Sequence, residues 1–132
     1  MLPNGNLLIL SGSGWVDETD SSGKKFRSFL GLNNPFDADR LANGNTIVAD
    51  SSNNRLVEFG PDGKIVWKKD DLPFPNNVFR LNDGRTLYTT YTSGVVAMLN
   101  VDGEEIWQKQ LPNSTLFSVY CDDHEILSLI HI

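Results

Sequence analysis

The chain has 132 residues, of which 39% are apolar, and it carries a formal net charge of −6. This length is typical of one domain with a buried core, and the acidic balance without a Lys/Arg cluster argues against binding to a nucleic-acid backbone. The single cysteine, Cys121, excludes an internal disulfide and a cysteine-rich metal site.

The first ten residues, "MLPNGNLLIL", lack the basic leader and long apolar core of a signal peptide, and no apolar run is long enough to cross a bilayer. The segment "LPNGN" at 2–6 returns as "LANGN" at 41–45, one residue out of step, and Gly23 then regains the step against Gly63. Residues 1–34 are therefore predicted to be a partial repeat unit whose first strand is missing.

The second unit, residues 35–74, is predicted to contain four short strands, at 37–41, 46–50, 55–59 and 64–69. The segments between them, "ANGN", "SSNN" and "GPDG", supply the positive backbone angles that Asn and Gly tolerate best in tight hairpins. The strands are rich in Ile, Val, Leu, Phe and Trp, and "TIVA" is apolar on both sides, which suits sheets packed face to face.

The third unit, residues 75–114, repeats the second at a spacing of forty residues without a gap. The matching pairs are Arg40 and Arg80, Gly44 and Gly84, Asp62-Gly63 and Asp102-Gly103, and Trp67 and Trp107. Farther on, "CDDHEIL" at 121–127 falls over "LNDGRTL" at 81–87, so residues 115–126 are predicted to start a further unit.

A period near forty with four strands in each unit is typical of a β-propeller blade. We therefore predict an all-β fold in which blades of four antiparallel strands form an incomplete open arc of about three blades. Propellers close with about four to eight blades, and closure protects their edges. Such an arc is expected to belong to a longer chain or to associate with copies of itself.

The final six residues, "LSLIHI" at 127–132, carry a separate hypothesis. The codons CTG TCT CTT ATA CAC ATC would encode them, and that string resembles the adapter of transposase-based sequencing libraries. We expect these residues to be an adapter artefact and the natural chain to be cut at or near Ile126. The alternative is a genuine strand of the fourth unit, because "EILSLIHI" is β-prone.

The "GKIVW" of 63–67 and the "GEEIW" of 103–107 resemble the Gly-x-x-x-Trp docking element of PQQ-like (quinoprotein-like) propellers. "ADSSNNRLVEFGPDGK" is similar to the NHL repeat, and "LANGNTIVAD…GKIVW" to arylsulfotransferase-like blades. The resemblance implies that Trp67 and Trp107 lie on outer strands and dock against the neighbouring blade, whereas the first unit has Arg27 there. No cofactor is expected, because the tryptophan floor, charged ring partners and calcium ion of full quinoproteins cannot be mapped onto this chain.

Three acidic positions are predicted to be structural turn residues. Asp50 precedes "SSNN" and could belong to a cation loop, but the acidic spacing matches no calcium loop; we expect it to accept hydrogen bonds from the backbone of the turn. Asp62-Gly63 and Asp102-Gly103 fit hairpin turns better than catalytic acids. Recurrence at the blade period likewise favours packing over a ligand clamp for the two tryptophans.

Arg40 and Arg80 are candidate ligand contacts, because each lies near the end of a predicted first strand, which lines the channel of a propeller. A buried or channel-facing arginine needs an anionic partner, and Asp37 or Asp39 could provide it within the same unit. We expect an inter-blade ion pair, and a ring of guanidinium groups facing an anionic ligand is the alternative.

Two loops lead into the inner strands, at Pro35–Asp37 and Pro75–Asn77, and by fold analogy they are the expected ligand-facing segments. Their candidate contacts are Asp37, Asn76 and Asn77. His124 aligns with Gly84 in a hairpin turn, with no nucleophile or orienting carboxylate beside it. We therefore predict a solvated turn residue, although arylsulfotransferases use a channel histidine.

Two classes of function follow. In the first, the chain is part of a non-enzymatic binding or assembly scaffold whose loops face a protein, a carbohydrate or another small molecule. In the second, it is a fragment of an arylsulfotransferase-like enzyme or a quinoprotein dehydrogenase whose catalytic residues lie in other blades. No catalytic or metal-binding residue is assigned here, and the resemblance implies a periplasmic or extracellular location.

Overall fold

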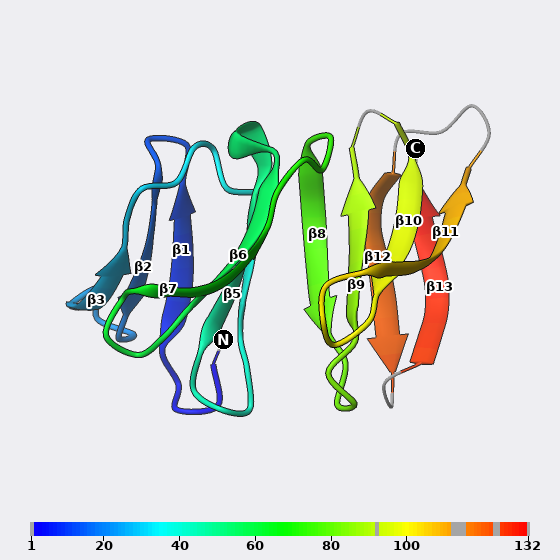
Figure 1. The fold of residues 1–132 in the computed structure, drawn as a ribbon. Helices are drawn as coiled ribbons and strands as arrows, with labels where there is room; N and C mark the ends of the chain where they lie inside the picture. The colour runs from blue at the N-terminus through cyan, green and yellow to red at the C-terminus, as the bar shows by residue number, and fades with distance from the viewer. Residues whose placement is uncertain (1, 92, 112–115, 123–124, 132) are drawn as a thin grey trace.

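Antiparallel strands form nearly all the regular structure in the computed structural model, which describes residues 2–91, 93–111, 116–122 and 125–131 (Figure 1). Blade 1 contains β1 (Leu7–Ser11), β2 (Trp15–Thr19) and β3 (Lys25–Phe29). Blade 2 contains β4 (Asp37–Arg40), β5 (Thr46–Asp50), β6 (Arg55–Phe59) and β7 (Ile65–Lys69), and blade 3 contains β8 (Pro75–Arg80), β9 (Thr86–Thr90), β10 (Val95–Leu99) and β11 (Glu105–Gln110). A fourth sheet pairs β12 (Leu116–Asp122) with β13 (Glu125–His131).

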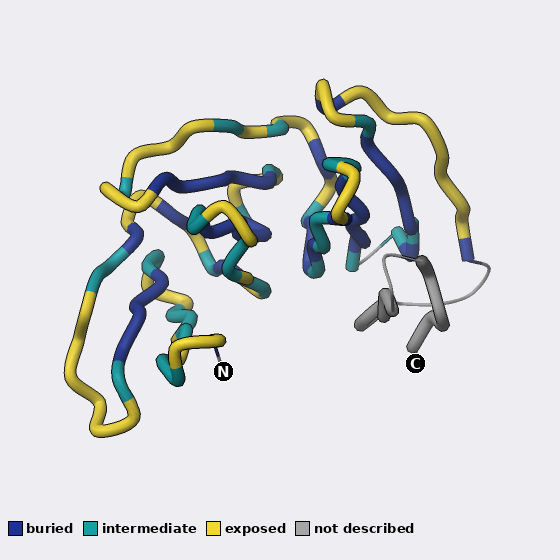
Figure 2. Tube along the Cα trace, turned by 90° about the horizontal axis from the view of Figure 1, so that it is seen from below, coloured by how far each residue is buried: buried dark blue, intermediate teal, exposed yellow. Residues whose placement is uncertain are grey.

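The blades stand side by side in an open arc, with their outer strands on the convex rim (Figure 2). Each blade is a meander in which strands pair in chain order, so β4 is innermost in blade 2 and β7 outermost. The inner strands β4 and β8 lie next to each other, and β12 lies beside β8. The prediction of four-stranded antiparallel blades in an incomplete arc is confirmed.

The hairpin between the first two strands of blade 2 follows from its "LANGN" sequence. Leu41 N–H donates to Asn45 O (2.8 Å), and Gly44 N–H donates to Leu41 O (3.0 Å). Gly44 has a φ of +89°, which a side chain would disfavour, and Asn43 Oδ1 accepts from Asn45 N–H (3.0 Å). The same backbone bonds recur in residues 2–6 and 81–85, which explains why the motif repeats.

The outer hairpins share a second device. Gly60 N–H donates to Lys64 O (2.8 Å), Gly63 has a φ of +82°, and the pairing register shifts between Glu58 and Phe59. A turn of this kind places a left-handed glycine beside a β-bulge. Register shifts fall at equivalent places in the other two blades, between residues 18 and 19 and between 98 and 99.

The "SSNN" segment differs from the predicted hairpin turn. It forms a short 3₁₀ helix, η1 (Ser51–Asn53), which ends at Asn54 in the left-handed conformation with a φ of +55°. Ser51 is buried, and its hydroxyl donates to the backbone oxygen of Pro75, where blade 3 begins. This segment therefore connects strands and also contacts the next blade.

The hydrophobic cores lie between blades. On β5, Ile47 and Ala49 belong to the core shared with blade 3, which includes Val78 and Leu99, whereas Val48 belongs to the core shared with blade 1. Because side chains alternate across a strand, consecutive residues of β5 serve different cores. All five residues of β5 are buried, which explains why "TIVA" is apolar on both sides.

At the end of the chain, β13 runs from Glu125 to His131, across the predicted boundary at residues 126 and 127. The boundaries of the predicted units stay predictions. The adapter origin of residues 127–132 stays a prediction. Within the described ranges, no helix has the length and apolar character needed to span a bilayer.

Candidate functional site

A buried ion pair joins blade 2 to blade 3. Glu58 on β6 accepts from Arg80 on β8, with 3.1 Å between Oε1 and Nη1, and its other oxygen accepts from Asn45 Nδ2 (2.7 Å). Arg80 Nε donates to Thr86 Oγ1 (2.9 Å). The Glu58 carboxylate is thus held by donors from both blades, which fixes their relative position.

The same arrangement joins blade 1 to blade 2. Arg40 donates through Nη2 to Glu18 Oε1 and through Nε to Thr46 Oγ1 (3.0 Å), and Asn6 Nδ2 donates to Glu18 Oε2 (2.7 Å). Arg27 adds a second cation, with its Nε 2.9 Å from Glu18 Oε1. Although burial of the carboxyl raises its pKa, the hydrogen bonds from Arg40 and Asn6 and the charges of Arg40 and Arg27 lower the pKa of Glu18 to about 2.

The partners of the two arginines differ from those considered in the sequence. Asp39 contacts Arg40 only by accepting from its backbone N–H (2.9 Å), and Asp37 bonds to blade 3. The carboxylates that hold Arg40 and Arg80 come instead from β2 and β6, each the strand next to the outermost strand of the preceding blade. Spacing along one unit could not reveal these partners, because they lie 22 residues away along the chain in each case.

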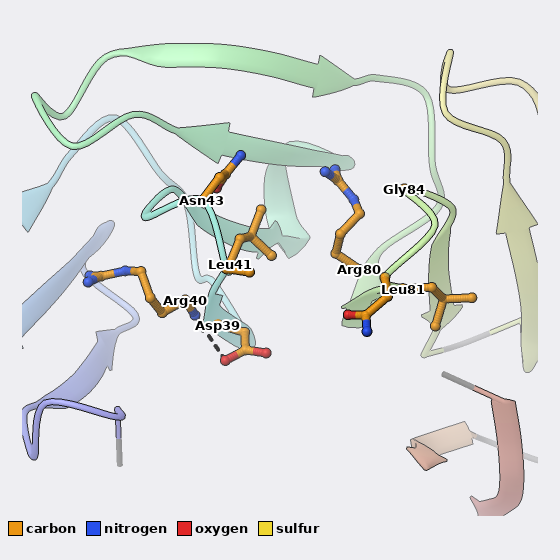
Figure 3. Close-up of a pocket in the computed structure, with 9 residues that line it drawn as sticks. Asp39, Arg40, Leu41, Asn43, Arg80, Leu81 and Gly84 are labelled. Atoms are coloured by element: carbon orange, nitrogen blue, oxygen red, sulfur yellow. Dashed lines mark hydrogen bonds between the residues drawn. The ribbon is translucent and has the colours of Figure 1, made fainter. Parts of the chain in front are cut away.

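A cavity of about 380 Å³ lies between the hairpin that joins β4 to β5 and the hairpin that joins β8 to β9 (Figure 3). It is lined by residues 39–43, 80–82 and 84. Arg40, Arg80 and Asp39 all border the cavity, and the side chain of Arg40 points away from Arg80 (Figure 3). Because Glu18 and Glu58 hold the two guanidinium groups, the cavity does not offer a ring of free guanidinium groups.

Trp67 lies between blades 2 and 3. A Cβ on Gly103 would lie 3.5 Å from the Trp67 ring, and the guanidinium carbon of Arg80 lies 5.3 Å from the ring centroid. The equivalent Trp107 is 43% exposed. In blade 1 the position belongs to Arg27, whose Nη1 donates to Pro61 O of blade 2 (3.3 Å), so a polar contact takes the place of the ring.

Asp50 is fully buried at the start of η1. Its carboxylate accepts from Asn33 N–H (2.8 Å), Asn53 Nδ2 (2.9 Å) and Arg55 Nε (2.7 Å). The backbone donor is therefore in the linker from blade 1 rather than in the following turn. Asp50 ties that linker to the second blade.

The two Asp-Gly pairs lie in outer hairpins. Asp62 Oδ1 accepts from Lys64 N–H (3.0 Å), and Gly63 N–H donates to Gly60 O (3.0 Å). In the next blade Gly103 N–H donates to Asn100 O (3.0 Å), and Asn100 Oδ1 accepts from Asp102 N–H (3.0 Å).

We define the upper face as the face that carries the loops into β4 and β8 and the segments after β5 and β9; it is uppermost in Figure 1. Here Asp37 Oδ2 accepts from Asn77 Nδ2 and from Val78 N–H, both at 3.0 Å, so it links β4 to β8. Asn76 is buried and its Oδ1 accepts from Thr89 Oγ1 (2.7 Å). The three candidate residues of these loops thus lie together at the junction of blades 2 and 3.

Asp37 is held in an unfavourable environment for a charge. Burial raises the pKa of its carboxyl to about 6; the charge of Asp39 adds to the rise, and backbone hydrogen bonds from Val78 and Ala38 oppose it. Between pH 3.8 and about 6 the folded chain therefore binds more protons at Asp37 than the unfolded chain does. Its contribution to stability falls as the pH rises through this range.

The Asp37→Asn variant is expected to unfold with a free energy about 1 to 3 kcal/mol higher than the wild type at pH 7.5, and with a nearly equal value at pH 4. The asparagine can still accept from Val78 N–H, but it carries no charge. Urea unfolding at the two pH values measures the difference, and Asp62→Asn on the exposed outer hairpin is the control. A loss of stability at pH 7.5 would contradict the account of Asp37.

Three aromatic rings meet on the upper face, and we call them the aromatic cluster: Phe36, Phe74 and Tyr91. Phe36 and Phe74 lie edge to face, with centroids 5.1 Å apart, and Tyr91 lies 6.1 Å from Phe74 and 6.4 Å from Phe36. Phe36 is 46% exposed. The rings come from the linkers into two consecutive blades and from the segment after β9, so they meet only in the folded chain.

Sequence reasoning missed both the glutamates and the aromatic cluster. Glu18 and Glu58 are forty residues apart, as Arg40 and Arg80 are. This shared period is a sequence signal that could have paired each glutamate with an arginine. The cluster has the opposite signal, because Phe36, Phe74 and Tyr91 stand where the neighbouring unit has Asn76, Asn34 and Ser51.

No group of three or more His, Cys, Asp or Glu side chains that could hold a metal ion occurs in the part of the chain that the structure describes. His124 lies outside the described residues, so its predicted place in a turn stays a prediction.

No protein-family model and no curated protein matches the chain. Solved structures do match. A protein of unknown function from Bacteroides caccae is 16% identical, with a TM-score of 0.72 over 93% of this chain and 48% of its own length. The WD40 β-propeller domain of Doa1 is 14% identical, with a TM-score of 0.79 over 90% of this chain and 41% of its own.

A streptogramin B lyase is 14% identical, with a TM-score of 0.74 over 89% of this chain and 42% of its own length. The chain thus spans less than half the length of these proteins. At such identities the likeness shows the fold alone: the chain is a β-propeller fragment.

Proposed function

We propose that the chain is part of a PQQ-like β-propeller that acts as a non-enzymatic binding and assembly scaffold. The different positions of repeated and non-repeated residues support this proposal. The repeated polar and aromatic residues serve the joints between blades, as in the Glu58–Arg80 ion pair and the contact of Trp67 with Gly103. Residues that depart from the repeat, foremost the aromatic cluster, lie in loops of the upper face, where a partner can reach them.

Strand β1 at the open edge of blade 1 supports assembly. β1 is an edge strand of its sheet, and Leu7 and Ile9 are 37% and 43% exposed, because Leu8 and Leu10 face the core shared with blade 2. An exposed strand edge with apolar side chains is a template for pairing with another chain. The partner is a further blade or a second copy of this chain.

We expect size-exclusion chromatography with light scattering to show a mass above the monomer that rises with concentration. Ile9→Lys should return the mass toward the monomer, because it places a charge on the open face of β1. Val66→Lys, on the exposed rim of blade 2, is the matched control and should leave the mass unchanged. A fully folded wild-type monomer at all concentrations would count against assembly.

The alternative is a fragment of an arylsulfotransferase-like or quinoprotein enzyme whose catalytic residues lie in other blades. It is supported by the Gly-x-x-x-Trp resemblance and by the likeness to a structure named as a lyase. Because this alternative places the catalytic residues in other blades, the test uses a chain extended by those blades: transfer of sulfate from 4-nitrophenyl sulfate to phenol by the extended chain would favour the alternative over a scaffold.

A further inference from the structure

The aromatic cluster is not required by the blade fold. Phe36, Phe74 and Tyr91 have polar counterparts in the neighbouring unit, and those counterparts occupy the same places in well-formed blades. A ring that only filled a repeated space would recur with the repeat, as the outer-strand tryptophan does. The cluster therefore needs a reason specific to the junction of blades 2 and 3.

Backbone conformation strengthens this point. Phe74 has a φ of +51°, and its counterpart Asn34 has the same value, so the linker requires a left-handed residue here in both units. Asparagine tolerates this conformation, whereas a bulky side chain is disfavoured in it. Phenylalanine is thus placed where the fold favours asparagine, and strain of this kind is typical of functional positions.

The cluster is also fixed in place before any partner arrives. Phe74 N–H donates to Asn54 Oδ1 (3.1 Å), Tyr91 N–H donates to Phe74 O (3.1 Å), and Phe36 N–H donates to Ala49 O (3.1 Å). A preformed surface loses little conformational entropy on binding. The side-chain oxygen of Asn54 is used in this support.

The surrounding loops carry charge of one sign. Residues 30–37, 50–54, 70–77 and 90–94 include four aspartates and no Lys, Arg or His. Asp50 pairs with Arg55 and Asp70 with Lys68, whereas Asp37 and Asp71 pair with no Lys or Arg within the described residues. The face therefore combines the exposed ring of Phe36, and two rings of intermediate burial, with two aspartates that no described Lys or Arg pairs with.

We infer that the aromatic cluster binds a basic segment of a partner protein, with an arginine side chain over the rings. A guanidinium group is attracted by the face of an aromatic ring and by nearby carboxylates, so one side chain satisfies both features of the surface. A small ligand would need a concavity that encloses most of its surface. The cavity lined by Arg40 and Arg80 lies on another face, and the ring of Phe36, which is 46% exposed, instead suits contact with a protein surface. This inference rests on the proposed binding function.

The test is a titration of the 132-residue chain with acetylated tetra-arginine amide at low salt, followed by intrinsic fluorescence or NMR. Phe74→Asn is expected to weaken binding about fivefold or more, because it removes one ring while keeping the net charge. The variant places at position 74 the residue that the chain already uses at the same φ in Asn34, so folding should be retained. Tetra-glutamate should not bind.

Phe26→Val is the matched control, since Phe26 is 67% exposed on the outer strand of blade 1 and its counterpart is Val66. It should bind the peptide as the wild type does. Equal binding by wild type and Phe74→Asn would overturn the inference, because only the general negative charge would then attract the peptide. If Phe74→Asn fails to fold, Phe36→Asn, which copies Asn76, applies the same test with the same two outcomes. Association through Ile9 uses another surface, so its result does not depend on this one.

Discussion

Replacing Glu18 by alanine is expected to lower the free energy of unfolding by about 3 to 5 kcal/mol, the largest effect of any single change at the blade joints. The Glu18 side chain is fully buried and receives both Arg27 and Arg40. Removing it leaves two guanidinium groups without their carboxylate, and unpaired buried charge is costly. Urea unfolding at pH 7, followed by tryptophan fluorescence, measures the loss.

The pH dependence of stability provides a second test of the Glu18 carboxylate. The folded-state pKa of Glu18 is about 2 against the usual 4.5, so its stabilising contribution is present above pH 4.5 and is lost as the pH falls toward 2. A shift of this size corresponds to about 3 kcal/mol. The Glu18→Ala variant should therefore lose less stability than the wild type over this range.

The repeat itself suggests uncharged substitutions for the Glu58–Arg80 ion pair. Forty residues after Glu58 and Arg80 the sequence has Met98 and Tyr120, neither of which is charged at pH 7. Glu58→Met alone should be strongly destabilising, whereas Glu58→Met combined with Arg80→Tyr should recover most of the loss. Asp102→Ala, at an exposed turn, should change stability by less than about 0.5 kcal/mol. Equal losses for the single and double variants would contradict a paired charge.

Trp67→Ala is expected to cost about 2 to 4 kcal/mol, because the ring packs against the core between blades 2 and 3 and lies against Gly103. The equivalent change Trp107→Ala should cost less than about 1 kcal/mol, because that ring is 43% exposed. The two variants remove the same atoms from the same strand position. Their difference, measured by thermal or urea unfolding with circular dichroism, isolates the contribution of the neighbouring blade.

Equal costs for the two tryptophan changes would mean that the ring stabilises its own sheet and not the joint. A second readout separates these cases. Gly103→Ala places a methyl group about one van der Waals contact from the Trp67 ring and also strains a residue with a φ of +85°. In the Trp67→Ala background the loss of unfolding free energy caused by Gly103→Ala should be smaller than in the wild type. The difference between the two losses is the part that arises from contact with the ring.

The blade strands could be predicted from the sequence because their signals are local. Turn residues recur at fixed places, and the predicted strands of blade 2 agree with the observed ones except that residues 41 and 64 lie just outside. The four-stranded antiparallel blade and the open arc follow from the forty-residue period. The exception among the connections is "SSNN", where the buried Ser51 contacts the next blade, and no local rule encodes that contact.

The joints between blades could not be predicted in the same way. The sequence indicated that Arg40 and Arg80 need anions, but it did not show that strands β2 and β6 direct Glu18 and Glu58 toward the next blade. The aromatic cluster likewise depends on two linkers and a third segment that meet only in the folded chain. Both features depend on how sheets stack, and a periodic sequence specifies the sheet more directly than the stacking.

The alternation of β5 between two cores has a consequence for how the molecule unfolds. Val48 belongs to one core and Ile47 and Ala49 to another, so the strand cannot leave its place without opening both. Loss of one blade therefore weakens the blades on either side of it, and the energy of the array resides as much in the contacts between neighbours as within each sheet. Order in such an array propagates from blade to blade, which makes the partner at an open edge part of the folding reaction as well as part of the assembled structure.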